Sequence, residues 1–125
     1  MPSTLLTSNT SSISITAIAA GVKHPERVAG LHFFNPAPVM KLVEVVSGLA
    51  TSTEVVELLC QCVIAWGKQP VRCRSTPGFI VNRVARPYYA EAWRALEEQV
   101  ASAEVTDTAL RDGGGFPMGP LALTD

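Results

Sequence analysis

One histidine and one glutamate, twelve residues apart, are of the types that proton-transfer chemistry needs. His32 opens the run His-Phe-Phe-Asn-Pro, and Glu44 lies inside the apolar run Leu-Val-Glu-Val-Val at residues 42–46. A carboxylate buried in such a run without a partner is destabilising or takes up a proton. A neighbouring imidazole removes that penalty, and the carboxylate in turn fixes the histidine tautomer and stabilises the imidazolium that forms when it takes a proton. His32 and Glu44 are therefore a candidate general base and its partner.

Two predicted strands would bring these side chains together. Residues 28–34 and 41–47 are rich in apolar and β-branched types, and a proline-containing connection at 35–40 joins them. If the strands fold back on each other, His32 faces Glu44, and facing residues have Cβ atoms roughly 5 Å apart. An alternative stays open, in which His32 and Glu44 form a buried hydrogen bond that only stabilises the fold.

Length and composition restrict the class of protein. The chain has 125 residues, of which 47% are hydrophobic and 17% charged, so we expect one modest globular domain or a piece of a larger protein. The ten lysines and arginines are scattered and the net charge is −1, so we expect no nucleic-acid partner. No apolar run approaches the roughly 20 residues of a membrane span, so we expect no membrane insertion.

The cysteines and the N-terminus favour a cytoplasmic protein. No secretory signal is visible. The three cysteines are an odd number, and Cys60 and Cys62 should point to different faces of one predicted helix. We therefore expect reduced, packed cysteines and no metal site.

Strands and helices alternate up to about residue 73. A strand candidate at 4–7 is followed by the polar run Ser-Asn-Thr-Ser-Ser at 8–12, which is suited to cap a helix over 13–20. The sequence Thr51-x-x-Glu54 is a predicted capping box, and apolar residues then recur at helical spacing up to Gly67. This apolar face comprises Val55, Leu59, Cys62, Val63 and Trp66. A last short strand is predicted at 70–73.

The remainder of the chain reads as helical. Thr76 and Pro77 are suited to start a long helix over residues 78–100, which contains Pro87, and Ser102 should start another that stops at 112–115. An alternating pattern followed by an all-helical one indicates an α/β domain that is followed by an all-α domain.

Several segments together resemble one enzyme family. They are Ser-Asn-Thr-Ser-Ser at 8–12, Gly-Leu-His-Phe-Phe-Asn-Pro at 30–36, Met-Lys-Leu-Val-Glu-Val-Val at 40–46, Gly-Lys-Gln-Pro-Val at 67–71, Thr-Pro-Gly-Phe-Ile-Val-Asn-Arg at 76–83 and Gly-Phe-Pro-Met-Gly-Pro at 115–120. In this order they resemble the 3-hydroxyacyl-CoA dehydrogenase family. Within it, the sequence is most similar to the bacterial enzymes that oxidise 3-hydroxybutyryl-CoA or, in phenylacetate breakdown, 3-hydroxyadipyl-CoA.

The resemblance implies a fold, a cofactor and partners. Residues 1–75 would be the C-terminal part of an NAD-binding Rossmann domain, and residues 76–125 the N-terminal part of a helical domain that dimerises. The implied reaction is the NAD-dependent oxidation of (S)-3-hydroxyacyl-CoA to 3-oxoacyl-CoA. The implied partners are the acyl-CoA substrate and, in a full-length protein, a second copy of the chain.

The resemblance also implies roles for particular residues. His32 would be the general base, held by Glu44. Ser11 would lie near both the reacting oxygen and the nicotinamide, Asn9 and Asn35 near the cofactor, and Asn82 near the substrate carbonyl. Ser11 is also suited to cap a helix, and Asn35 before a proline is a common turn residue.

One expected element of this family is missing from the sequence. The cofactor pyrophosphate is expected on a Gly-x-Gly-x-x-Gly turn after a first strand, and the chain has no such turn. We therefore expect a fragment that lacks most of the cofactor site and is inactive by itself. Two alternatives are a non-catalytic helical piece that self-associates and a dehydrogenase of hydroxy acids or sugar acids on the same fold.

Overall fold

The computed structural model describes residues 4–124. The chain divides into two compact units, Met1–Ile80 and Val81–Asp125, and each is described by itself.

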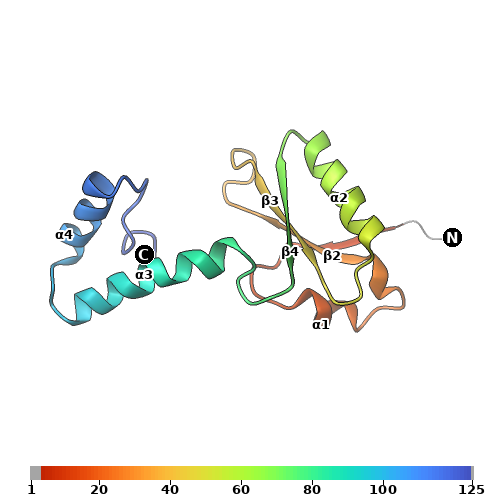
Figure 1. Cartoon of the computed structure of the whole chain (residues 1–125), viewed down its shortest axis with the longest axis horizontal. Helices are drawn as coiled ribbons and strands as arrows, with labels where there is room; N and C mark the ends of the chain where they lie inside the picture. Colours follow the sequence, from red (N-terminus) through yellow and green to blue (C-terminus); the bar gives the residue numbers. More distant parts are fainter. Residues whose placement is uncertain (1–3, 125) are drawn as a thin grey trace. The chain divides into compact units, whose positions relative to one another are not determined.

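The first unit is built on a four-stranded mixed sheet. Its strands are β1 (Leu6–Ser8), β2 (Val28–Phe33), β3 (Leu42–Ser47) and β4 (Gln69–Arg74) (Figure 1). Hydrogen bonds join them in that order. The pairs β1–β2 and β3–β4 are parallel, whereas β2 and β3 are antiparallel.

The predicted pairing of β2 with β3 is confirmed. His32 lies directly opposite Glu44, and the same register places Leu31 opposite Val45 and Phe33 opposite Val43. Each strand is one residue shorter than expected at the end that meets the connection 34–41. The two residues of the candidate site are therefore cross-strand neighbours.

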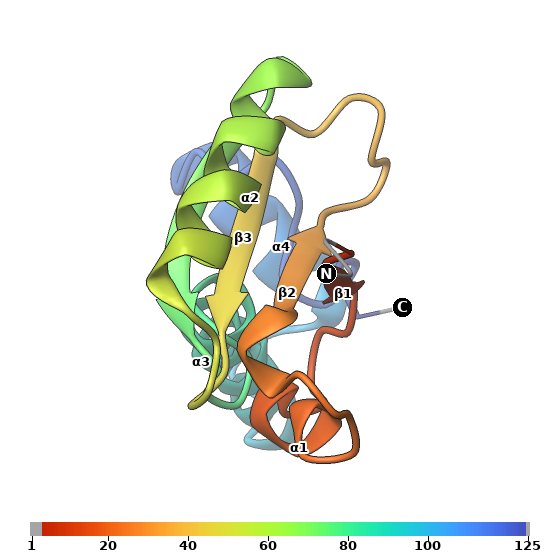
Figure 2. The ribbon, with the colours of Figure 1, turned by 90° about the vertical axis from the view of Figure 1, so that its right-hand side faces the viewer.

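Helices α1 (Ile15–Ala19) and α2 (Thr53–Ala65) cover opposite faces of the sheet (Figure 2). A short 3-10 helix, Pro25–Arg27, precedes β2. Alternate strand residues point to opposite faces, so each helix has its own apolar cluster. On the α2 face the buried residues are Ala29, Leu31, Val43, Val45, Val55, Leu59, Cys60 and Val63. On the α1 face they are Ile15, Ala19, Val28, Val46 and Phe79.

Both helix caps in this unit differ from the prediction. Helix α1 is capped by the Ser14 hydroxyl, and not by the polar run 8–12. Helix α2 is capped by Ser52, whose hydroxyl accepts a hydrogen bond from the Val55 amide. The Thr51 hydroxyl instead donates to the Val28 carbonyl at 2.6 Å and accepts from the Gly48 amide at 2.9 Å. Thr51 therefore ties the loop to β2 and is not available as a cap.

The apolar face predicted for α2 is correct in part. Val55, Leu59 and Val63 are buried, but Trp66 is 55% exposed, because the helix ends one residue before it. Cys62, also predicted on this face, is only half-buried, whereas its neighbour Cys60 is buried. Gly67 follows with φ +73°, the left-handed conformation that ends many helices.

The second unit is helical. It contains α3 (Val81–Glu97), α4 (Ala103–Thr108) and a π-helical turn (Ala109–Gly113). Ser102 caps α4 as predicted, and Pro87 lies inside α3. None of the helices in residues 4–124 is long and apolar enough to cross a membrane.

The predicted start of the long helix at Thr76–Pro77 is wrong. Gly78 and Phe79 have φ +76° and +48°, and the chain forms a turn before α3 begins at Val81. Positive φ is incompatible with a right-handed helix, so two consecutive residues of this kind delay its start.

Gly30 on β2 offers a test of the packing beneath the candidate site. A Cβ there would lie 2.7 Å from Val46 Cβ and 3.1 Å from Ile15 Cδ1. We expect Gly30→Ala to lower the free energy of unfolding by about 1–3 kcal/mol, as overpacked cores do. Urea denaturation measures the change, and Gly21→Ala is the control because its new Cβ would meet only the Ile18 carbonyl oxygen, at 3.7 Å. Equal stability of the two variants would contradict this packing.

Candidate active site

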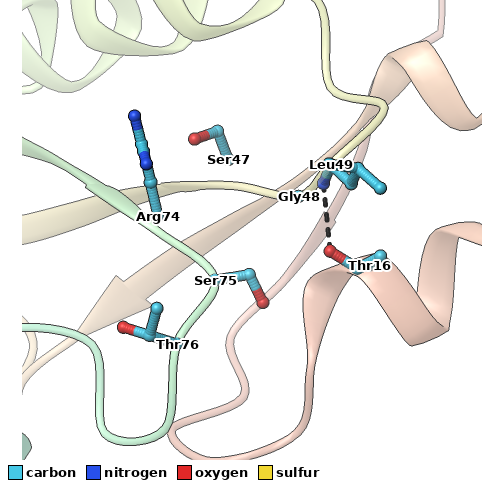
Figure 3. A pocket seen from close by; sticks show the side chains of 7 residues that line it. All are labelled: Thr16, Ser47, Gly48, Leu49, Arg74, Ser75 and Thr76. Atoms are coloured by element: carbon cyan, nitrogen blue, oxygen red, sulfur yellow. Dashed lines mark hydrogen bonds between the residues drawn. The ribbon is translucent and has the colours of Figure 1, made fainter.

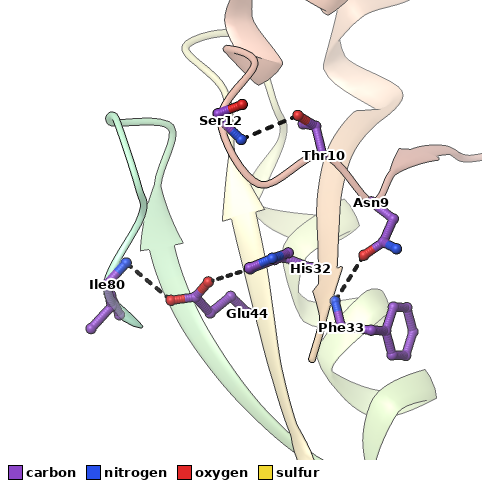
Figure 4. Close-up of polar contacts among 7 residues, drawn as sticks. All are labelled: Asn9, Thr10, Ser12, His32, Phe33, Glu44 and Ile80. Atoms are coloured by element: carbon purple, nitrogen blue, oxygen red, sulfur yellow. Dashed lines mark hydrogen bonds and ion pairs between the residues drawn. The ribbon is translucent and has the colours of Figure 1, made fainter. Parts of the chain in front are cut away.

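A hydrogen bond joins the two residues that the sequence singled out. The His32 Nδ1 lies 2.7 Å from Glu44 Oε2 (Figure 4). The Glu44 side chain is fully buried and the His32 side chain is 8% exposed. The hydrogen bond predicted from the strand pairing is thus present in the folded chain.

The second carboxylate oxygen of Glu44 is also engaged. The Ile80 amide donates to Oε1 at 3.0 Å (Figure 4). Hydrogen bonds from an imidazole and a backbone amide compensate for the burial of the carboxylate, which would otherwise be costly. They also hold it from two sides, so its orientation toward His32 is fixed.

The geometry selects one tautomer of His32. A carboxylate only accepts hydrogen bonds, so Nδ1 carries a proton, and in the neutral imidazole the lone pair is then on the other ring nitrogen, Nε2. Nε2 has no hydrogen-bond partner among residues 4–124, yet that region contains no fully buried side-chain nitrogen or oxygen left unpaired. Nε2 is therefore not completely buried, and in the neutral ring it can take a proton from a bound molecule.

Two aromatic rings contact the imidazole. The Phe34 ring lies 4.7 Å from it between centroids, and the Phe79 ring lies 5.6 Å away in an edge-to-face arrangement. Phe79 is buried on the α1 face of the sheet and Phe34 is half-buried. The apolar contacts leave His32 little freedom to rotate.

The polar residues expected to hold a cofactor lie in the segments that follow β1 and β2. Strands β1 and β2 are parallel, so their carboxyl ends share one edge of the sheet, where α/β proteins bind ligands. Asn9 follows β1, and its side-chain oxygen accepts a hydrogen bond from the Phe33 amide at 2.9 Å (Figure 4). Ser11 and Asn35 are exposed in the segments that follow the two strands. That these side chains contact the cofactor stays a prediction.

Ser11 and Asn82, the two residues expected to contact the substrate, belong to different units. Ser11 lies in a bend before α1, and its predicted capping role is wrong because Ser14 is the cap. Asn82 is half-buried in the first turn of α3, in the second unit. That these two side chains face the same substrate stays a prediction.

Sequence reasoning missed the part of the site that comes from the turn after β4. The Ile80 backbone amide leaves no signature in a sequence, because every residue except proline has one. Phe79 did offer a signal, because it is a large apolar residue directly after Pro-Gly. Pro-Gly favours a turn, and an apolar side chain in a turn is exposed unless it packs on the sheet.

The cavity in Figure 3 is separate from these residues. Its volume is about 330 Å³, and it lies where β3 and β4 end, beside α1. Three of its hydroxyls make hydrogen bonds that hold the fold: Thr16 accepts from the Leu49 amide, Ser75 accepts from the Ile15 amide, and Ser47 donates to the Cys73 carbonyl. We assign this cavity no role in the site. Among residues 4–124, no group of three or more histidine, cysteine or acidic side chains could hold a metal ion.

The pKa of the Cys73 thiol is affected by the charge of Glu44. Burial raises the pKa of its thiol from 9.0 to about 11, and the negative charge of Glu44 contributes to the shift. Both causes disfavour a second negative charge on this face of the sheet, so the thiol stays protonated at neutral pH.

The tautomer of His32 can be observed directly. Two-bond ¹H–¹⁵N spectra of the ¹⁵N-labelled chain should show His32 with a protonated Nδ1 and an unprotonated Nε2 near pH 8. Exposed His24, whose Nδ1 lies 3.2 Å from Glu26, is the internal reference in the same spectrum. A His32 signal typical of the other tautomer would mean that the bond to Glu44 does not form.

The reactivity of Cys73 should depend on pH in a defined way. In a Cys60→Ala, Cys62→Ala variant, we expect alkylation by iodoacetamide at pH 8 to be about 100-fold slower in the folded chain than in urea, because the thiolate fraction falls tenfold per unit of pKa. The rate should keep rising with pH up to about 11. A plateau near pH 9 would contradict the shift. Adding Glu44→Gln to this variant should lower the pKa of Cys73 only part of the way back to 9.0, because the thiol remains buried.

Both parts of the chain match models of one protein family. Residues 1–76 match the family described as "3-hydroxyacyl-CoA dehydrogenase, NAD binding domain", and residues 78–125 match "3-hydroxyacyl-CoA dehydrogenase, C-terminal domain". The expected combination of part of a Rossmann-type NAD-binding domain with the start of a helical domain is thereby confirmed.

Individual relatives include bacterial and human enzymes. The chain is 83% identical over 124 residues to the 3-hydroxyadipyl-CoA dehydrogenase of Escherichia coli K12, covering 99% of this chain and 26% of that protein. It is 53% identical over 122 residues to human mitochondrial hydroxyacyl-coenzyme A dehydrogenase, covering 98% of this chain and 39% of the relative.

Solved structures give the same result. The crystal structure of 3-hydroxybutyryl-CoA dehydrogenase from E. coli K12 matches with a TM-score of 0.95 at 82% identity, covering 99% of this chain and 26% of that one. That of (S)-3-hydroxybutyryl-CoA dehydrogenase from Ralstonia eutropha matches with a TM-score of 0.95 at 43% identity, covering 98% and 44%. The chain thus spans 26% to 44% of the length of these relatives. Its fold, motifs and sequence place it in the 3-hydroxyacyl-CoA dehydrogenase family.

Proposed function

We propose that this chain supplies the general base of an enzyme that oxidises (S)-3-hydroxyacyl-CoA to 3-oxoacyl-CoA with NAD. The observation that carries the proposal is the hydrogen bond between Glu44 and His32 Nδ1, which in the neutral imidazole leaves the lone pair on Nε2. An unprotonated imidazole at this place can accept the proton of a substrate hydroxyl.

The role of each residue follows from the charge that develops. His32 Nε2 takes the hydroxyl proton, and the buried Glu44 carboxylate stabilises the imidazolium that forms. Ser11 and Asn82 are neutral donors that would stabilise the substrate oxygen without competing for its proton. Asn9, Ser11 and Asn35 would hold the nicotinamide end of NAD, which supplies the hydride acceptor when bound.

The identity of the substrate is proposed from the relatives. The name of the E. coli relative points to 3-hydroxyadipyl-CoA, which is expected in phenylacetate catabolism. The name of the similar E. coli crystal structure points to 3-hydroxybutyryl-CoA. The identities of 83% and 82% support these two substrates equally, so we propose a 3-hydroxyacyl-CoA substrate and test both compounds. A homodimer and a cytoplasmic location are proposed from the family resemblance alone.

Replacing His32 tests the proposal. Because the chain covers 26% of the E. coli relative, activity is measured on a chimera in which this chain replaces the matching segment of that enzyme. We expect His32→Ala to lower kcat by about 10² to 10⁴, the usual worth of a general base. NADH absorbance with 3-hydroxyadipyl-CoA and 3-hydroxybutyryl-CoA as substrates gives the rates.

His24 provides a matched control within the chain. It also lies beside a glutamate, Glu26, but its side chain is 46% exposed and it belongs to a loop outside the site. We expect His24→Ala to leave kcat and KM unchanged. Full activity of His32→Ala in the same chimera would refute the proposed function.

A further inference from the structure

The turn that follows β4 has an unusual backbone. Gly78 and Phe79 are both in the left-handed region, with φ +76° and +48°, and the Phe79 amide closes the turn on the Thr76 carbonyl at 3.0 Å. Glycine adopts this conformation readily, whereas a bulky residue does so rarely. Such a conformation persists only where the surrounding structure over-determines it, and residues of this kind cluster at functional sites.

The side chain of Phe79 explains what holds the turn in place. It is 4% exposed and packs with Ile15, Val28 and Val46 on the α1 face of the sheet. The same ring meets the His32 imidazole at 63° and 5.6 Å between centroids. The ring therefore links the apolar cluster to the candidate base.

The backbone of the same turn contacts the other member of the pair. The peptide that joins Phe79 to Ile80 carries the amide that donates to Glu44 Oε1 at 3.0 Å, and its direction is set by the dihedral angles of Phe79 (Figure 4). The other oxygen of the same carboxylate bonds to His32. One residue with a left-handed backbone thus places its ring on the histidine and its peptide on the glutamate.

We propose that Phe79 is a positioning residue for the base, acting through both His32 and Glu44. Its ring limits rotation of the imidazole, and its peptide keeps the carboxylate turned toward Nδ1, so that Nε2 stays aimed at the substrate hydroxyl. The inference rests on the proposed role of His32 as the general base. Small displacements of a catalytic group are costly in rate, so the loss should appear in kcat.

A substitution of Phe79 in the chimeric enzyme tests this. Phe79→Leu keeps an apolar side chain in the cluster but removes the ring edge from His32. We expect kcat to fall about 10- to 100-fold, in line with the effect of a misplaced catalytic group, with KM changed less than about twofold. Ile15→Val is the matched control, because it trims the same apolar cluster without touching His32, and it should keep kcat within about twofold of the unsubstituted chimera.

A second readout distinguishes positioning from a general loss of packing. In ¹H–¹⁵N spectra of the ¹⁵N-labelled chain, Phe79→Leu should shift His32 toward a mixture of tautomers, while Ile15→Val leaves the Nδ1-protonated form unchanged. If Phe79→Leu does not fold by circular dichroism, Phe79→Met replaces it, since methionine fills irregular space and lacks an aromatic edge.

The outcomes separate this inference from the proposed function. If His32→Ala is inactive but the Phe79 variant matches Ile15→Val in both kcat and tautomer, Phe79 is packing only and the inference is overturned. If His32→Ala keeps full activity, the proposed function fails and this inference fails with it. A loss of kcat and a mixed tautomer in the Phe79 variant alone support the inference.

Discussion

The burial of the Glu44 carboxylate is the constraint on which the rest of the first unit depends. The side chain is fully buried in the middle of a sheet strand, where an unpaired charge would be strongly destabilising. It is tolerated because β2 supplies an imidazole and the turn after β4 supplies an amide. Burial of Glu44 therefore requires that β2, β3 and β4 pair in this register and that the turn after β4 has this conformation.

The same constraint explains why the register of β2 and β3 is well specified. A slip by one residue would turn Glu44 toward the face that packs on α2, where Val43 and Val45 are buried. Gly30 has the related function of leaving room for Val46 and Ile15. The connection between the two strands is held by Lys68, whose ammonium group donates to the Ala37 and Met40 carbonyls at 2.6 and 2.8 Å. A charge from outside the hairpin thus fixes the loop that joins the strand of His32 to the strand of Glu44.

The sequence predicted what depends on local pattern. The strands, their antiparallel pairing and the contact between His32 and Glu44 followed from apolar runs around a short connection, and Ser102 was correctly identified as a cap. The caps of α1 and α2 were misplaced by one to several residues, because neighbouring serines and threonines are chemically equivalent until the loop geometry chooses among them. The turn at Gly78 and Phe79 was not foreseen, since its left-handed backbone is imposed by tertiary packing. Contacts made by a backbone amide, such as that of Ile80, have no sequence signature at all.

The central claim is that His32 and Glu44 act as one catalytic unit, and a double-mutant cycle in the chimeric enzyme tests it most directly. Glu44→Gln keeps an acceptor for the Ile80 amide but presents a donor to Nδ1, so the imidazole must protonate Nε2 and loses its lone pair there. Each single variant should lower kcat by about 10² to 10⁴, and the double variant should be no slower than His32→Ala alone, as expected for residues that work as a unit. Losses that multiply in the double variant, or a Glu44→Gln enzyme with normal kcat, would contradict the account.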